Sequence, residues 1–201
     1  MEQVFSDKIF SLFDIPTLEG RMAVIQSEVQ PMFRHYGALI AERIPSEQPL
    51  PVHVAKHLRR TVYPPNVTWV GIGGDKRGYK KYAHFQLGIN AEYVFVMLAI
   101  IDNPPSRAKM ASQLLTQVSQ LEQLPNTYCV IPDHTRETFL RQEAINYTDL
   151  LTQLQTCQKA EFMLGRLLPK GSEILNDSTK FTAWLQETID TLLPYYQLLN
   201  T

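Results

Sequence analysis

Three segments rich in β-branched and aromatic residues follow one another in the middle of the chain, and they constrain the fold more than any other feature. They are VTWVGI (67–72), YKKYAHFQLGI (79–89) and EYVFVMLAII (92–101). Such segments favour β-strands. Only the GGDKRG loop and the Asn90–Ala91 corner separate them, and connections this short join antiparallel neighbours. The sequence therefore predicts an antiparallel β-meander.

Helical patterns stand before and after this meander. From Leu18 to Leu39, apolar residues recur every three or four positions, and Asp14 is a candidate N-cap. This pattern predicts one long helix over residues 14–44, bent at Pro31. Shorter helices are predicted over 51–60 and after residues 103, 133, 146 and 176, with a further strand over 126–133.

Consecutive strands flanked by helical segments, rather than a strict alternation of the two, predict an α+β fold. We expect about four or more antiparallel strands to pack against the long N-terminal helix and the C-terminal helices. The 201 residues, 44% of them apolar and 19% charged, show no internal repeat or shift in composition. Residues 1–201 are therefore expected to form a single domain.

The first residues and the two cysteines bear on the compartment. The start, MEQVFSDKIF, lacks the basic region and apolar run of a signal peptide, and the longest apolar stretch is far shorter than a bilayer requires. Cys129 and Cys157 lie on apolar sides of predicted elements and are expected to be buried, inert thiols. We expect a cytoplasmic protein with no membrane partner.

Positive charge is concentrated in one part of this nearly neutral chain. Residues 51–84 carry seven Lys and Arg against one acid, Asp75, a net charge of +6, whereas the whole chain is −1. The predicted helix over 51–60 would place four basic or imidazole side chains on one face, and the strand from Tyr79 would present others in alternation. The resulting predicted binding residues are His53, Lys56, His57, Arg59, Arg60, Lys76, Arg77, Lys80, Tyr82 and His84.

Such a cluster has an electrostatic cost that a bound anion offsets. Two like charges about 7 Å apart repel by roughly 0.6 kcal/mol in water. We expect these groups to bind a small ligand that carries phosphate or carboxylate, rather than to form a solvated face. The alternatives are binding of nucleic acid, most plausibly RNA, and docking of an acidic protein partner. His57 or His84 can act as general acid or base, but no spacing of catalytic groups decides whether the protein is an enzyme.

Several known motifs do not match. GIGGDKRG leads into a strand instead of a helix, so a hairpin turn with positive φ at its glycines is expected instead of a phosphate loop. His53 and His57 have the spacing of two metal ligands, but Lys56 and Arg60 beside them oppose a cation. The sequence therefore predicts no metal and no cofactor.

A second group of candidates follows the predicted strand over 126–133. In IPDHTRE, Asp133 is expected to cap a helix, which would carry His134 and Arg136 in its first turn. Residues just beyond strand ends often reach a binding site. His134 and Arg136 are therefore secondary candidates, whereas Trp69 is expected in the core.

The segment HVAKHLRRTVYPPNVTWVGIGGDKRGYKKYAHFQ resembles the YktB-like family of uncharacterised bacterial proteins. The resemblance lies in His53, Ala55–His57, Arg59–Val62, Pro64–Trp69, Lys76–Lys80 and His84–Gln86, with LEGRM (18–22) earlier in the chain. It implies an α+β fold with an antiparallel sheet. No catalytic role is associated with the family, so the resemblance assigns none here.

Overall fold

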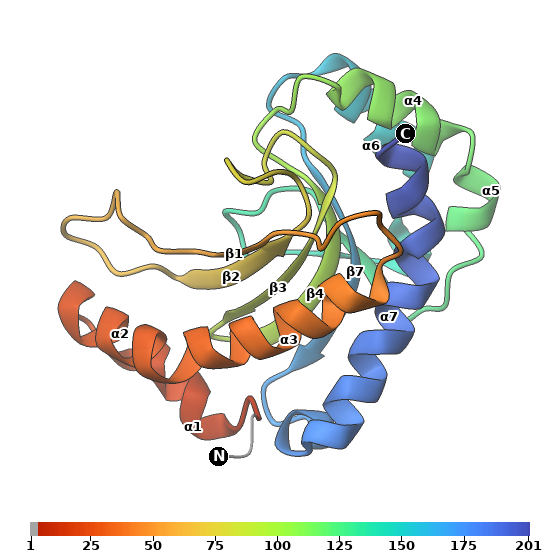
Figure 1. Cartoon of the computed structure of the whole chain (residues 1–201). Helices are drawn as coiled ribbons and strands as arrows, with labels where there is room; N and C mark the ends of the chain where they lie inside the picture. The colour runs from red at the N-terminus through yellow and green to blue at the C-terminus, as the bar shows by residue number, and fades with distance from the viewer. Residues whose placement is uncertain (1–3) are drawn as a thin grey trace.

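A seven-stranded antiparallel sheet, with the strand order β1-β2-β3-β4-β7-β5-β6, forms the centre of the computed structural model, which describes residues 4–201 (Figure 1). This confirms the predicted α+β class and the central meander β2-β3-β4. The strands are β1 (Val52–Val54), β2 (Val67–Ile72), β3 (His84–Asn90), β4 (Tyr93–Ile100), β5 (Tyr128–Ile131), β6 (Leu140–Arg141) and β7 (Phe162–Pro169).

The long N-terminal helix is also confirmed, as consecutive segments α2 (Leu18–Val24), a π-turn (Ile25–Val29) and α3 (Gln30–Arg43). Its cap is Thr17, whose hydroxyl accepts a hydrogen bond from the Gly20 amide, and not the predicted Asp14. The π-turn directly precedes Pro31, which has no amide hydrogen to continue the helical pattern. The remaining helices are α1 (Asp7–Phe10), α4 (Arg107–Leu115), α5 (Val118–Leu121), α6 (Tyr147–Thr156) and α7 (Ser178–Leu199).

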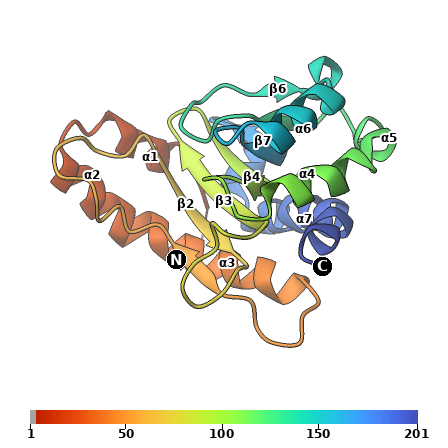
Figure 2. The same cartoon turned by 90° about the horizontal axis from the view of Figure 1, so that it is seen from above.

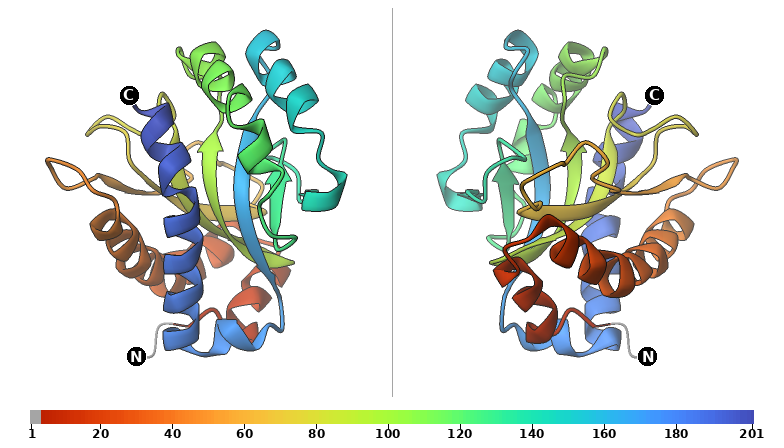
Figure 3. Two further views of the ribbon diagram at one scale, coloured as in Figure 1. Left: turned by 90° about the vertical axis from the view of Figure 1, so that its right-hand side faces the viewer. Right: turned by 90° about the vertical axis from the view of Figure 1, so that its left-hand side faces the viewer.

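One face of the sheet, the helix face, is covered by α3 and α7 (Figure 2). Helices α4 and α6 lie side by side at one end of the same layer (Figure 3). Alternate residues of β3 and β4, such as Phe85, Leu87 and Val96, enter this main core. Their neighbours point to the opposite face, the loop face, where a smaller apolar cluster forms around Phe95 and Met97. None of the helices within residues 4–201 has the length and apolar character needed to cross a bilayer.

The predicted helix over 51–60 was wrong. Val52 and Val54 instead form the edge strand β1, paired with Ile72 and Val70 of β2, because β-branched residues favour extended pairing. His57 then adopts a positive φ of 51°, which a helix cannot contain. An extended loop over 55–66 follows and projects from the sheet alongside α2 (Figure 1), where Arg21 donates a hydrogen bond to the Pro65 carbonyl.

The hairpin reading of the glycine-rich loop is confirmed. Gly73, Gly74 and Gly78 have φ values of 114°, 75° and 150°. The following strand begins later than predicted, at His84 instead of Tyr79, so residues 73–83 form a longer connection.

Three predictions in the C-terminal half were also wrong. The helix predicted after residue 146 was expected to include Leu164, but Leu164 lies in strand β7. This strand was missed because a central strand that is apolar on both faces has no period-2 pattern in its sequence. No helix follows Asp133, whose carboxylate instead accepts hydrogen bonds from the amide and hydroxyl of Thr135. Cys129 is buried as expected, but Cys157 is exposed.

Candidate functional site

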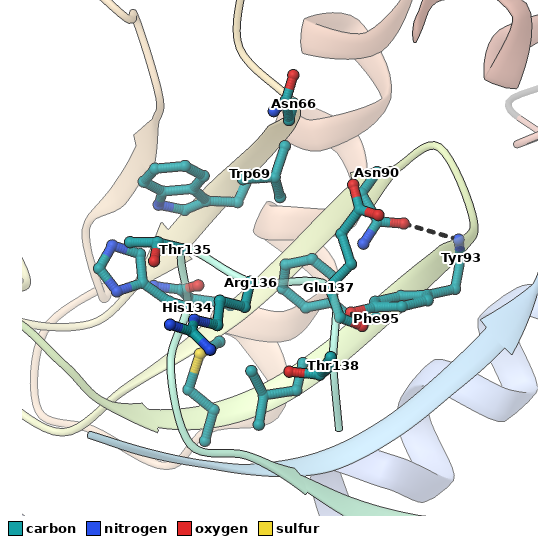
Figure 4. Close-up of a pocket in the computed structure, with 14 residues that line it drawn as sticks. Asn66, Trp69, Asn90, Tyr93, Phe95, His134, Thr135, Arg136, Glu137 and Thr138 are labelled. Carbon is teal, nitrogen blue, oxygen red and sulfur yellow. Dashed lines mark hydrogen bonds between the residues drawn. The ribbon is translucent and has the colours of Figure 1, made fainter. Parts of the chain in front are cut away.

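A cavity of about 480 Å³ lies on the loop face of the sheet (Figure 4). Its base is formed by side chains of β2, β3 and β4, and its outer wall by the loop after β5. This volume is within the usual range for sites that bind small molecules. Its lining includes Asn66, Trp69, Gln86, Phe95, His134 and Arg136.

Gly88 allows two aromatic rings to lie on the sheet at this point. Trp69 of β2 and Phe95 of β4 are the register partners of Gly88 in β3. A Cβ atom on residue 88 would lie only 2.2 Å from Phe95 Cζ. The ring of Phe95 therefore occupies the space above the glycine and becomes part of the cavity wall.

A buried histidine fixes the amide of Gln86. His84 Nδ1 lies 2.9 Å from the carbonyl oxygen of Tyr82, which can only accept, so Nδ1 carries the proton. His84 Nε2 then accepts from Gln86 Nε2, also at 2.9 Å. Burial lowers the pKa of His84 to about 4, so the ring is neutral at pH 7. Because its NH₂ group faces His84, Gln86 offers its carbonyl oxygen to the cavity.

His134 is paired with Glu161 at the cavity wall. Its Nδ1 lies 2.7 Å from Glu161 Oε2, and the same oxygen accepts a hydrogen bond from the His134 amide at 3.0 Å. The hydrogen bond to Glu161 raises the pKa of His134 above its usual value. Arg136, on the same loop, is exposed, and its Nε lies 3.3 Å from Asp133 Oδ2. The two secondary candidates thus line the cavity, although on a turn and not on the predicted helix.

Asp102 and Lys80 extend this charged cluster. The Asp102 amide donates to Glu161 Oε1 at 3.0 Å, and the Asp102 carboxylate forms an ion pair with Lys80. Asp102, His134 and Glu161 each offer a metal-ligating atom, and these atoms lie within 4.8 Å of one another. A divalent cation would have to displace the Lys80 ammonium and the proton shared by His134 and Glu161.

Beyond this cluster lies a shallow groove of about 410 Å³ lined by Arg59, Lys80 and Lys81, together with Asp102 and Asn103. Arg59 comes from loop 55–66, and the two lysines come from the connection 73–83. Two of the predicted basic segments therefore do meet on one recess, with Lys81 exposed in it and not on the core-facing side that the strand pattern predicted.

The other predicted residues do not join that recess. His53 and Lys56 line a separate depression against α3. His57 is partly buried, with Nε2 3.0 Å from Thr68 Oγ1, and burial together with the Arg60 charge lowers its pKa to about 4. Arg60 donates to the Pro64 carbonyl at 3.4 Å. The Tyr82 hydroxyl donates a hydrogen bond to the Asp75 carboxylate. Lys76 and Arg77 lie on the exposed hairpin turn, and His84 is fully buried.

Sequence reasoning missed most of the cavity. Trp69 was assigned to the core, but it stands half-buried at the cavity wall. The available signal was the pair of amide side chains, Gln86 and Asn90, within an otherwise apolar strand. Burying a polar side chain costs free energy unless it forms hydrogen bonds, so such residues on a buried strand indicate a polar site. Glu161 gave no signal, since it lies within a segment that was predicted as helix.

Fold and site together define an α+β protein with an aromatic cavity of ligand size beside a basic groove. The model of a family described as a domain of unknown function (DUF1054) matches residues 5–196. The UPF0637 protein OB1420 of Oceanobacillus iheyensis is 39% identical over 200 residues, covering 96% of this chain and 95% of that protein. A UPF0637 protein of Enterococcus faecalis is 39% identical, with 97% of each chain covered, and one of Lactococcus lactis is 38% identical, with 98% of each covered.

The chain therefore belongs to the DUF1054 family, and the resemblance to a family of uncharacterised bacterial proteins is confirmed.

Proposed function

We propose that this protein binds a small molecule that has a planar ring and an acidic group, such as a phosphate or a carboxylate. The observation that carries the proposal is the cavity on the loop face, where Trp69 and Phe95 flank Gly88. Aromatic walls of this kind favour stacking against a flat ring.

Polar groups at the cavity suit the rest of such a ligand. The Gln86 carbonyl and the amide groups of Asn66 and Asn90 can pair with hydrogen-bonding edges of a heterocycle. His134 and Arg136 can form charge-assisted hydrogen bonds with an acidic substituent. This retains the anionic ligand predicted from the sequence but moves its main contacts from the basic segment to the cavity.

The proposal places the protein in the cytoplasm. Cys129 and Cys157 form no disulfide, and thiols remain reduced in that compartment.

A thermal-shift screen tests the binding role. Adenosine 5′-monophosphate, adenosine, an aromatic carboxylate such as indole-3-acetate, and glucose 6-phosphate represent the possible combinations of ring and acid. Binding to the native state raises the melting temperature by mass action. We expect the ring-bearing acids to raise it most, and glucose 6-phosphate to have little effect.

Two variants locate the site. Trp69→Leu removes the stacking surface and should weaken binding of every ring-bearing ligand about tenfold or more. Arg136→Gln should weaken binding of the acids but not of adenosine. Lys8→Gln, which changes an exposed cation on α1, is the matched control. If no ring-bearing acid raises the melting temperature at millimolar concentration, or if Trp69→Leu binds as well as the wild type, the cavity is not the binding site.

A further inference from the structure

We propose that the ligand is a nucleotide within single-stranded nucleic acid, with one base in the aromatic cavity and the adjoining backbone in the basic groove. This inference rests on the proposed function, because the same cavity receives the base. It names the class of ligand and adds the groove formed by Arg59, Lys80 and Lys81 as a second part of the site.

The groove and the cavity are neighbours. His134 lines the cavity and is bonded to Glu161, Glu161 accepts from the Asp102 amide, and Asp102 lines the groove. The polar atoms of these three residues lie within 4.8 Å of one another. A chain whose base occupies the cavity therefore has its next phosphates within reach of the groove.

The two segments that meet at the groove carry unpaired cations, of which Arg59 and Lys81 line the groove itself. The two segments that meet there, loop 55–66 and connection 73–83, carry one acid, Asp75, between them. Apart from Lys80, their cations form no ion pair with any residue in the described range 4–201. These cations are Lys56, Arg59, Arg60, Lys76, Arg77 and Lys81. Cations left without carboxylate partners are the groups that bind backbone phosphates.

Loop 55–66 also exposes large apolar side chains. Leu58, Val62 and Tyr63 are 85%, 66% and 77% exposed. They lie on either side of Arg59 and Arg60 in the same loop, an arrangement in which a ring can stack on a base while the cations contact phosphates. Tyr63 is thus a second stacking position, outside the cavity.

These features favour nucleic acid over the other anionic partners. A flat lipid surface can contact the projecting loop but cannot place a ring in the cavity. An acidic protein segment supplies carboxylates for the groove but no repeated planar rings. Single-stranded nucleic acid supplies both phosphates and bases, and proteins bind it with a charged groove beside stacking aromatics.

Fluorescence anisotropy with a labelled eight-nucleotide RNA of mixed sequence tests the inference, with DNA of the same sequence as a second arm. Affinity should exceed that for adenosine 5′-monophosphate by tenfold or more and should fall with salt. For single strands the slope of log K against log salt is about −0.7 per phosphate contacted, so three to five contacts predict about −2 to −3.5. Binding of either nucleic acid supports the proposal, and the comparison identifies the sugar preferred.

Variants separate the two parts of the site. Arg59→Gln/Lys81→Gln should reduce the steepness of the salt slope by about 1.4, whereas the control Lys8→Gln/Lys159→Gln, also exposed cations, should not change it. Trp69→Leu should weaken RNA binding without changing the slope. Circular dichroism spectra of all the variants establish that they fold.

Four results would overturn the inference. The first is binding of adenosine 5′-monophosphate, blocked by Trp69→Leu, with no tighter binding of RNA, which leaves the proposed function intact. The second is no binding of either, which removes this inference and leaves the proposed function to be decided by the other ring-bearing acids of the screen. The third is an RNA affinity that Trp69→Leu leaves unchanged, or an affinity for heparin equal to that for RNA. Either result indicates only a general polyanion-binding surface. The fourth is binding to phosphatidylglycerol vesicles but not to RNA, which assigns the loop to lipid.

Discussion

The two faces of the sheet are built from the same strands but serve different ends. On the helix face, Phe85 and Leu87 of β3 are fully buried under α3 and α7. On the loop face, the alternate residues His84 and Gln86 support a cavity. Because side chains alternate along a strand, one short segment contributes to both. The comparison indicates that the helix face provides most of the stability and the loop face provides the binding surface.

The largest expected effect comes from truncating one aromatic ring on each face. Phe85 is 0% exposed, with its ring 5.1 Å from that of Tyr196, and Phe85→Ala should lower the free energy of unfolding by about 3–5 kcal/mol. Phe95→Ala should cost at least about 1 kcal/mol less, because its ring borders a cavity and has fewer packing partners to lose. Urea denaturation measures both. Equal losses would break the proposed division between the faces.

A pH titration of stability examines the histidine beneath the cavity. The pKa of His84 is lowered to about 4 by burial, against about 6.5 in an unfolded chain. The unfolded state therefore binds more protons between these values, so stability present above pH 6.5 is lost as the pH falls toward 4. At about 1.4 kcal/mol per pH unit, His84 contributes at most about 3–4 kcal/mol, and His57, whose pKa is lowered in the same way, adds a loss of the same sign.

His134 acts in the opposite sense. Its pKa is raised by the hydrogen bond to Glu161, so its contribution to stability is present at low pH and is lost as the pH rises through its folded-state pKa. Glu161→Gln should lower the pKa of His134 toward the usual value, which an NMR titration of the imidazole measures. An unchanged pKa would mean that Glu161 does not hold the proton on this ring.

A smaller effect is expected at Gly88. An added Cβ would clash with Phe95 at 2.2 Å, so Gly88→Ala should cost about 1–3 kcal/mol and should tilt the Phe95 ring into the cavity. Combining Gly88→Ala with Phe95→Ala removes the clash, and the two losses should then be less than additive. Additive losses would show that the glycine does not create the space for this ring.

The smallest perturbation is a thiol probe. The pKa of Cys129 is raised to about 12 by burial on the loop face, whereas Cys157 is exposed after α6. A disulfide reagent such as 5,5′-dithiobis(2-nitrobenzoate) should modify Cys157 at once, and Cys129 only when the protein unfolds. Rapid modification of both in the native protein would mean that the loop face opens readily.

The helix face could be predicted from the sequence far better than the loop face. Periodic apolar residues identified the long N-terminal helix and α7, and β-branched runs identified β2 and β4, because burial on one side leaves a regular pattern. Strand β7 escaped because it is apolar on both faces. Residues 51–60 were predicted as a helix because their basic and imidazole side chains recur at helical spacing, although Val52 and Val54 already favoured a strand.

The candidate site could be predicted only in part. Charge counting located Arg59 and Lys80, which do line one groove. It could not reveal that Lys80 pairs with Asp102, or that His134 pairs with Glu161, 27 residues further along the chain. Such contacts depend on how separate loops meet over the sheet, and no local spacing encodes them.

The most direct test of the ligand cavity follows the two tryptophan indole N–H signals by NMR during a titration with adenosine 5′-monophosphate. Trp69 stands at the cavity and donates to the Tyr79 hydroxyl at 2.6 Å, whereas Trp184 packs against Phe181 in the main core. The signal of Trp69 should shift in a saturable way, and that of Trp184 should remain in place. A Trp69 signal that does not move at millimolar nucleotide would contradict the assignment of the loop face as the binding surface.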